Sequence, residues 1–147
     1  MKYLLMFATL AAGALLPVQA VLNTRLGRQT GGPLMGSLLS FVVGLIALLL
    51  LILVTQPGSV PQLRSTQAGP WYVWLGGLLG AMYVGYITWV NQQQGVALTF
   101  ALVVSGQMLI SLVIDHFGLL GSAVRMITLE KLIGAALIIV GLVLIKR

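Results

Sequence analysis

Residues 15–33 decide the fold; they read LLPVQAVLNTRLGRQTGGP and join two long apolar runs. Within them, Gln19 and Asn23 stand four residues apart, so both side chains lie on one face of a helix. Arg25 follows two residues later. A polar face at membrane depth is costly unless it meets protein or water. The stretch therefore predicts a place where the chain handles something polar.

The composition is that of an integral membrane protein. Hydrophobic residues make up 59% of the 147 residues, charged residues make up 7%, and the mean hydropathy is +1.08. Soluble domains carry about 25% charged residues. The chain has no cysteine and one histidine, so we expect no disulfide, no metal site and no cofactor. The net charge of +6 comes from basic residues scattered at the ends of apolar runs, so we expect no nucleic-acid partner.

Five apolar runs predict an all-α integral membrane protein with a single domain over residues 1–147. The expected transmembrane helices cover residues 3–22, 34–54, 71–90, 96–115 and 131–145. The polar connections between them are residues 23–33, 55–69, 91–95 and 117–127. The first run also fits a secretory signal peptide that ends at Ala20, but the apolar run continues beyond that residue. Whether the first span is ever cleaved stays open.

Small residues predict where helices approach closely. Gly36, Ser40 and Gly44 recur every four residues in the second span, with Ser37 beside them. The aromatic cluster at the start of the third span, which is typical of an interfacial belt, comprises Trp71, Tyr72 and Trp74.

The last span has the signals of a capped helix with one small face. Thr128 can cap its start and Glu130 then falls in the first turn, where a negative charge is favourable. Gly134 and Gly141 stand seven residues apart and face one way. Small residues let two backbones approach, so these glycines predict the contact of a homodimer.

Polar and aromatic side chains on three spans predict a substrate site. The expected substrate-binding residues are Gln19, Asn23, Tyr83, Tyr86, Ser105, Gln107 and Ser111. Tyr83, Tyr86 and Trp89 recur every three residues, as a ridge that either packs against neighbouring helices or forms a cavity wall. Asp115 shares a face with Gln107 and is the one candidate for coupling to a proton or sodium gradient. Its ordinary role would be a helix-end group that reaches water.

The basic residues do not choose an orientation in the membrane. With five spans, one side carries Lys2, Arg64, Arg125 and Lys131, and the other carries Arg25, Arg28, Lys146 and Arg147. The positive-inside rule acts on the difference between the two sides, which here is nil. A chain without an orientation signal can insert both ways and pair head to tail, which recreates the inverted-repeat symmetry of many transporters. A partner, or the N-terminal amine, could equally decide the orientation.

The chain resembles the YdcZ-like five-span family of the drug/metabolite transporter superfamily over essentially its whole length. The residues that carry the resemblance are Leu16-Pro17-Val18-Gln19-Ala20, Leu22-Asn23, Leu26-Gly27, Ser40-Phe41-Val42-Val43-Gly44, Gly106-Gln107, Asp115-His116-Phe117-Gly118 and the Gly134–Gly141 helix. The resemblance implies a small inner-membrane transporter or exporter with alternating access, and antiparallel dimers for members with dual topology. The last helix is also similar to the dimerisation helix of small multidrug resistance transporters. Those exporters have a glutamate where this chain has Gln19, so their exchange of protons for cations does not carry over.

These observations predict a secondary transporter of a small polar metabolite in the bacterial inner membrane, working as an antiparallel homodimer. Amides and hydroxyls suit a neutral or zwitterionic solute. An alternative is an organic-cation exporter that uses Tyr83, Tyr86 and Trp89, with Asp115 as counter-charge. Another is an accessory membrane subunit without transport of its own. An enzyme is not expected, because no catalytic pair stands at a useful spacing. Substrate identity, direction and coupling ion stay open.

Overall fold

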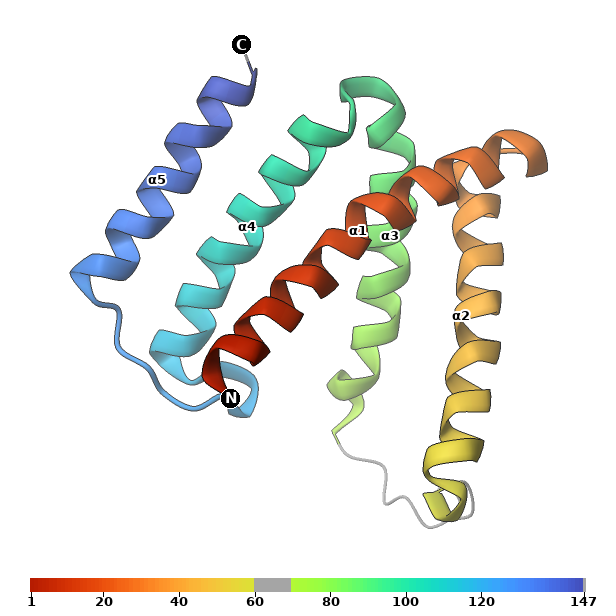
Figure 1. Cartoon of the computed structure of the whole chain (residues 1–147), viewed down its shortest axis with the longest axis horizontal. Coiled ribbons are helices and arrows are strands. Elements are labelled where there is room, and N and C mark those ends of the chain that lie inside the picture. Colours follow the sequence, from red (N-terminus) through yellow and green to blue (C-terminus); the bar gives the residue numbers. More distant parts are fainter. Residues whose placement is uncertain (60–69, 147) are drawn as a thin grey trace. The chain divides into compact units, whose positions relative to one another are not determined.

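The computed structural model describes residues 1–59 and 70–146, and all regular structure in this part of the chain is helical. It divides into two compact units, Met1–Gln93 (unit 1) and Gln94–Arg147 (unit 2). Unit 1 contains α1 (Lys2–Thr30), α2 (Pro33–Thr55), the short turns η1 (Pro57–Ser59) and η3 (Trp71–Trp74), and almost all of α3 (Leu75–Gln94). Unit 2 contains α4 (Val96–Phe117), η4 (Leu119–Gly121) and α5 (Leu129–Lys146). Figure 1 labels the five α-helices.

Four helices within the described residues are long and apolar enough to cross a membrane: α1, α2, α4 and the segment Trp71–Gln94 that contains α3. The all-α prediction is confirmed, and the five-span prediction is not. Helix α5 has 18 residues and includes Glu130, Lys131 and Lys146. Its apolar part, residues 132–145, is about 21 Å long at 1.5 Å per residue, against a hydrocarbon core of about 30 Å.

The predicted polar connection at residues 23–33 is wrong, because α1 continues to Thr30. Arg, Leu and Gln are good helix formers, and nothing before Gly31 interrupts the backbone. The helix ends at Gly31, whose φ of 98° is left-handed, and the Gly32 amide donates to the Gly27 carbonyl at 2.8 Å. Pro33 then begins α2, a position where its missing N–H has no cost.

The connection predicted at residues 91–95 is also shorter than expected. Helix α3 includes Gln94, so the connection is Gly95 alone, at φ 84° and ψ 163°. That conformation belongs to glycine, which explains why one residue is enough. The other helix ends differ from the predicted spans by a few residues, and α4 extends through Phe117.

Helices α1 and α2 meet where Gly31 and Gly32 join them, and from there they diverge (Figure 1). A Cβ atom on Gly36 would collide with the Asn23 carbonyl oxygen and lie 2.5 Å from the Gly27 nitrogen. The backbones therefore touch at Gly27 and Gly36. The predicted stripe continues less tightly, since a Cβ on Gly44 would meet no described atom within 4 Å.

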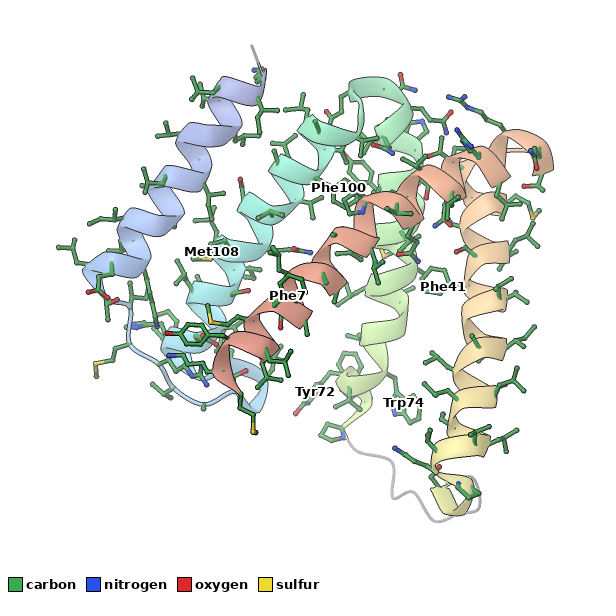
Figure 2. The ribbon with its side chains drawn as sticks, in the orientation of Figure 1. Phe7, Phe41, Tyr72, Trp74, Phe100 and Met108 are labelled. Atoms are coloured by element: carbon green, nitrogen blue, oxygen red, sulfur yellow. The ribbon has the colours of Figure 1, made fainter. Side chains whose placement is uncertain are left out.

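Every buried residue of unit 1, among those the structure describes, lies within residues 20–37 or 85–91. We call these two segments the packed end. The remainder of the three helices consists mostly of exposed apolar side chains, as expected of a surface for lipid. The predicted aromatic belt lies in η3, immediately before α3, and its rings are exposed; Figure 2 labels Tyr72 and Trp74.

Unit 2 is a helical hairpin in which α4 packs against α5. The loop after α4 folds back on it, because the Arg125 amide donates to the Asp115 carbonyl at 2.8 Å. The predicted cap of α5 is confirmed: the Lys131 amide donates to the Thr128 hydroxyl at 3.4 Å, and Glu130 stands in the first turn.

Candidate functional site

Three hydroxyl groups tie the helices of the packed end together. The Ser37 hydroxyl of α2 lies 3.0 Å from that of Thr88 on α3, and the Thr88 hydroxyl donates to the Val84 carbonyl at 2.8 Å. Thr24 of α1 lies with its hydroxyl 3.3 Å from the Thr88 carbonyl. Thr88 is fully buried, and Ser37 and Thr24 are 4% and 8% exposed. We call these three residues the hydroxyl cluster.

Each hydroxyl of the cluster can also donate within its own helix. Thr24 reaches the Ala20 carbonyl at 2.9 Å, and Ser37 reaches the Pro33 carbonyl at 2.9 Å. A serine or threonine that can bond to the carbonyl four residues earlier keeps a partner when a neighbouring helix moves away. Each hydroxyl would therefore keep a hydrogen-bond acceptor on its own helix if the helices separated here.

The packed end also contains polar atoms without a partner. Among the described residues, four buried side-chain atoms have no hydrogen bond, and three of them belong to unit 1. These three are Asn23 Nδ2 on α1, and Tyr83 Oη and Asn91 Oδ1 on α3. Asn23 is 3% exposed and Asn91 is 7% exposed. The fourth atom is His116 Nδ1 in unit 2.

The predicted site residues of unit 1 lie in different surroundings. Asn23 is buried but Gln19, one turn earlier on α1, is exposed. Tyr83 is half-buried and Tyr86 is 59% exposed. The packed end thus brings Asn23 into the protein and leaves Gln19 at the surface of unit 1.

The predicted site residues of unit 2 all lie on α4. Ser105 is 7% exposed, and its hydroxyl donates to the Ala101 carbonyl at 2.8 Å. Gln107 and Ser111 are exposed, and Asp115 is half-buried in the last turn. Ser105 therefore already has a hydrogen-bond partner, whereas Gln107 has its amide at the surface of unit 2.

The aromatic ridge of α3 borders an apolar pocket of about 340 Å³. Its lining residues are Pro33, Leu34, Gly85, Tyr86 and Trp89. The rings of Tyr86 and Trp89 are 5.9 Å apart and tilted by 45°. Tyr83 is not among the lining residues, so the three aromatic side chains do not form one wall. A pair of aromatic faces can hold a cation or stack on a planar group.

Sequence reasoning missed Thr24, Thr88 and Asn91. Threonine is common in membrane helices and bonds to its own helix, so the two threonines carried no distinct signal. The three glutamines and the glycine that follow Asn91 favour a turn, so the sequence places this residue in a connection rather than in a helix. One signal was present: Gly85, Thr88 and Asn91 recur every three residues, which places small and polar side chains along one face.

The described residues contain no group of three or more His, Cys, Asp or Glu side chains that could hold a metal ion. The chemistry of the packed end is that of hydroxyls and neutral amides. Arg25 and Arg28 are exposed, so neither brings a charge into it. These hydroxyls and amides can bind a polar molecule through hydrogen bonds.

Comparison with known proteins identifies the family. A family model described as "Putative inner membrane exporter, YdcZ" matches residues 4–144. The chain is 30% identical to the inner membrane protein YdcZ of Escherichia coli (strain K12) over 138 residues, which cover 94% of this chain and 91% of the relative. No solved structure matches the chain. The chain therefore belongs to the YdcZ family of inner membrane exporters and is a multi-pass protein of the inner membrane.

Proposed function

We propose that this protein is a secondary transporter that exports a small polar metabolite by alternating access. Membership of an exporter family supports export. The observation that carries the substrate class is the set of unpaired buried atoms, Asn23 Nδ2, Tyr83 Oη and Asn91 Oδ1. A buried polar atom without a partner costs about 1–3 kcal/mol, and lipid cannot supply the missing bond. A polar solute, or water that exchanges with it, can supply that hydrogen bond.

The proposal gives the packed end a second role, as the closed end of unit 1 in alternating access. A transporter must separate contacts on one side of its substrate while others form. The hydroxyl cluster suits this task because Thr24 and Ser37 each have a carbonyl of their own helix as an alternative acceptor. Thr24 and Ser37 are six and four residues from Thr30 and Pro33, so the cluster is within about 9 Å of those helix ends.

We also propose that α5 is the fifth span and that two copies assemble as an antiparallel homodimer. Lys131 and Lys146 at the ends of its short apolar part can reach the membrane surface with their long side chains. A Cβ on Gly134 or Gly141 would meet no described atom within 4 Å, so this face is available to a partner. Arg25, which would break the balance of charges if it were buried, is exposed. Arg64 and Arg147 lie outside the described residues.

Dual insertion has a direct test. Reporters fused after Arg147 should be found on both sides of the membrane, because basic residues are balanced. Two lysines added to the segment 56–69 should move the population to one orientation. A single orientation of the unmodified protein would reject dual insertion.

The transport proposal is tested with the purified protein in proteoliposomes. Neutral, zwitterionic, anionic and cationic solutes are loaded separately and their exchange is compared with empty liposomes. The proposal expects protein-dependent flux of neutral or zwitterionic solutes. If no solute moves with the protein alone, while co-expression with a larger transporter changes that partner's activity, the chain is an accessory subunit.

A second candidate, export of an organic cation, is favoured by the pocket beside Tyr86 and Trp89, whose tilted rings are 5.9 Å apart. The same flux assay distinguishes the organic-cation exporter from the exporter of a polar metabolite. Cation-selective flux that is lost in Trp89→Leu and retained in Asn23→Leu would support the cation exporter and reject the polar-metabolite proposal.

A further inference from the structure

The loop between α4 and α5, residues 118–128, exposes apolar side chains. Six of its eleven residues are hydrophobic, against three of fifteen in the other long connection, residues 55–69, so its composition is not that of a segment bathed in water. Leu120 is 82% exposed, Met126 is 76% exposed and Val124 is 65% exposed. Apolar side chains gain free energy when they leave water. An exposed patch of this kind marks contact with another protein or with a membrane.

The backbone of the loop restricts how deep in a membrane it can lie. Residues 122–128 have no regular secondary structure, and lipid cannot pair the N–H and C=O groups of an irregular backbone. The loop directly follows α4, a helix long and apolar enough to cross a membrane, so it begins at the surface of the bilayer. In that interface, headgroups and water can pair with the backbone while apolar side chains reach the acyl chains.

Two contacts within unit 2 hold the loop in place. The Arg125 amide donates to the Asp115 carbonyl at 2.8 Å, which brings the second half of the loop back to the last turn of α4. A Cβ on Gly118 would lie 2.7 Å from Val124 Cγ2, so these two residues are packed against each other. The apolar side chains are therefore presented from a fixed backbone, and contact with a membrane would order little that is not already ordered.

Leu120 at the middle of η4 is the most exposed side chain of the loop and has a strained backbone. Its φ is 56° and its ψ is 24°, and no other non-glycine residue in the described part of the chain has a positive φ. Glycine or asparagine adopts this left-handed conformation at a lower cost than leucine. Because the Leu120 side chain is 82% exposed, packing within the protein recovers little of that cost. Burial in an outside apolar phase can recover it.

We propose that this loop is an anchor in the membrane interface, with the side chains of Leu119, Leu120 and Met126 inserted between the acyl chains and the backbone among the headgroups. The partner is the bilayer itself. The inference does not depend on transport, because it rests only on the loop and on the place of this protein in the inner membrane.

The charges beside the loop favour no class of headgroup. Asp115 and Glu130 are negative and Arg125 and Lys131 are positive, so the four charges cancel. The Lys131 ammonium group also donates to the Met126 carbonyl at 2.9 Å, which engages it within the loop. Insertion therefore rests on apolar burial rather than on attraction to anionic lipid. We expect the loop to lie at the same depth in phosphatidylcholine alone and in a mixture with phosphatidylglycerol.

Fluorescence quenching in nanodiscs measures that depth. The chain has no cysteine, so Ala123→Cys gives one labelling site in the loop and leaves the larger apolar side chains in place. The quenchers are iodide in the water and phosphatidylcholine with a nitroxide near the headgroup end of an acyl chain. Gln93→Cys, at an exposed amide in the last turn of α3, is the control for a site in water. We expect the lipid nitroxide to quench the Ala123→Cys label severalfold more than the Gln93→Cys label, and iodide to show the reverse order.

Three results would overturn the proposal. Iodide quenching equal to that of the Gln93→Cys label, without quenching by lipid, would place the loop in water. Quenching by neither reagent would mean that protein covers the loop, either a second copy or another partner. Quenching by lipid only when phosphatidylglycerol is present would replace apolar insertion by recognition of an anionic headgroup.

Two substitutions then assign the insertion to Leu120. Leu120→Asn suits the left-handed backbone, so the loop should keep its conformation, but the amide is excluded from the acyl chains. With the label at Ala123→Cys, this variant should lose most of the quenching by lipid. Leu120→Met keeps an apolar side chain of similar size and should retain the quenching. Equal quenching by lipid in the two variants would overturn the role of Leu120 in the anchor.

Discussion

The two ends of unit 1 are built from similar residues and packed differently. At the packed end, Gly27 and Gly36 bring two backbones into contact, and hydroxyls connect three helices. Toward the other end the chain is also rich in small residues, namely Gly44, Gly76, Gly77 and Gly80. A Cβ on any of these four would meet no described atom within 4 Å. Glycine is thus present at both ends and allows close approach at only one.

The difference between the two ends of unit 1 shows what brings its helices into close contact. At the packed end, the Gly31–Gly32 connection holds α1 and α2 together, and buried hydroxyls have acceptors on adjacent helices. Among the described residues of the other end, the Thr9 and Thr55 hydroxyls donate to carbonyls of their own helices. Its apolar side chains gain nothing from contact with another helix that lipid does not also provide. Polar partners and a short connection, rather than small residues alone, bring these helices together.

The largest contrast should come from one substitution made at both ends. Gly36→Ala places a Cβ against the α1 backbone, which cannot rotate away, and should destabilise the protein by about 1–3 kcal/mol. Gly44→Ala fills open space and improves helix propensity, so it should stabilise by up to about 1 kcal/mol. Thermal unfolding in detergent measures both. A shift of the same sign and size for the two variants would contradict the account of the packed end.

A smaller effect is expected from the hydroxyls. Thr88→Val removes the acceptor of Ser37 and should cost about 0.6 kcal/mol, the average for interhelical hydrogen bonds in membranes. Thr9→Val is the matched control, because Thr9 is exposed and its hydroxyl donates only to the Leu5 carbonyl within α1. A double-mutant cycle with Ser37→Ala isolates the coupling between the two hydroxyls. A coupling of zero would mean that Ser37 and Thr88 are neighbours without an energetic connection.

The smallest effect on folding is expected in α5, whose glycines face open space as those of the less packed end do. Gly134→Leu and Gly141→Leu should leave the unfolding temperature of the monomer almost unchanged. If this face is the proposed dimer contact, the same variants should lower the fraction of dimer in detergent. Dimers that survive both changes would place the contact elsewhere.

Much of the fold follows from the sequence. Long apolar runs predicted helices at the right places, and the Thr128 cap was predicted from its spacing to the helix. The ends were harder, because Arg25 and Gln92 are polar residues that form helix as readily as loop. Glycine with a positive φ, at Gly31 and Gly95, marks the true ends.

The site could be predicted only in part. Asn23 and Tyr83, two of the predicted site residues, carry unpaired buried atoms, and their part in a substrate site stays a prediction. Gln19 shares a helix face with Asn23 but is exposed, because α1 begins to be buried only at Ala20. Periodicity shows which residues share a face; how far along a helix that face is covered depends on where the next helix crosses it. Asn91 was missed for the related reason that its helix extends beyond the apolar run.

The central claim, that the packed end must separate during transport, is tested most directly by a disulfide. The chain has no cysteine, so Ser37→Cys with Thr88→Cys introduces a single pair. The two hydroxyl oxygens are 3.0 Å apart, and sulfurs in their places need to approach by about 1 Å to bond. Flux of the solute carried by the unmodified protein is measured in proteoliposomes before and after oxidation, with each single variant as control. The account predicts that oxidation stops flux in the double variant alone and that dithiothreitol restores it; undiminished flux through the oxidised, cross-linked protein would contradict it.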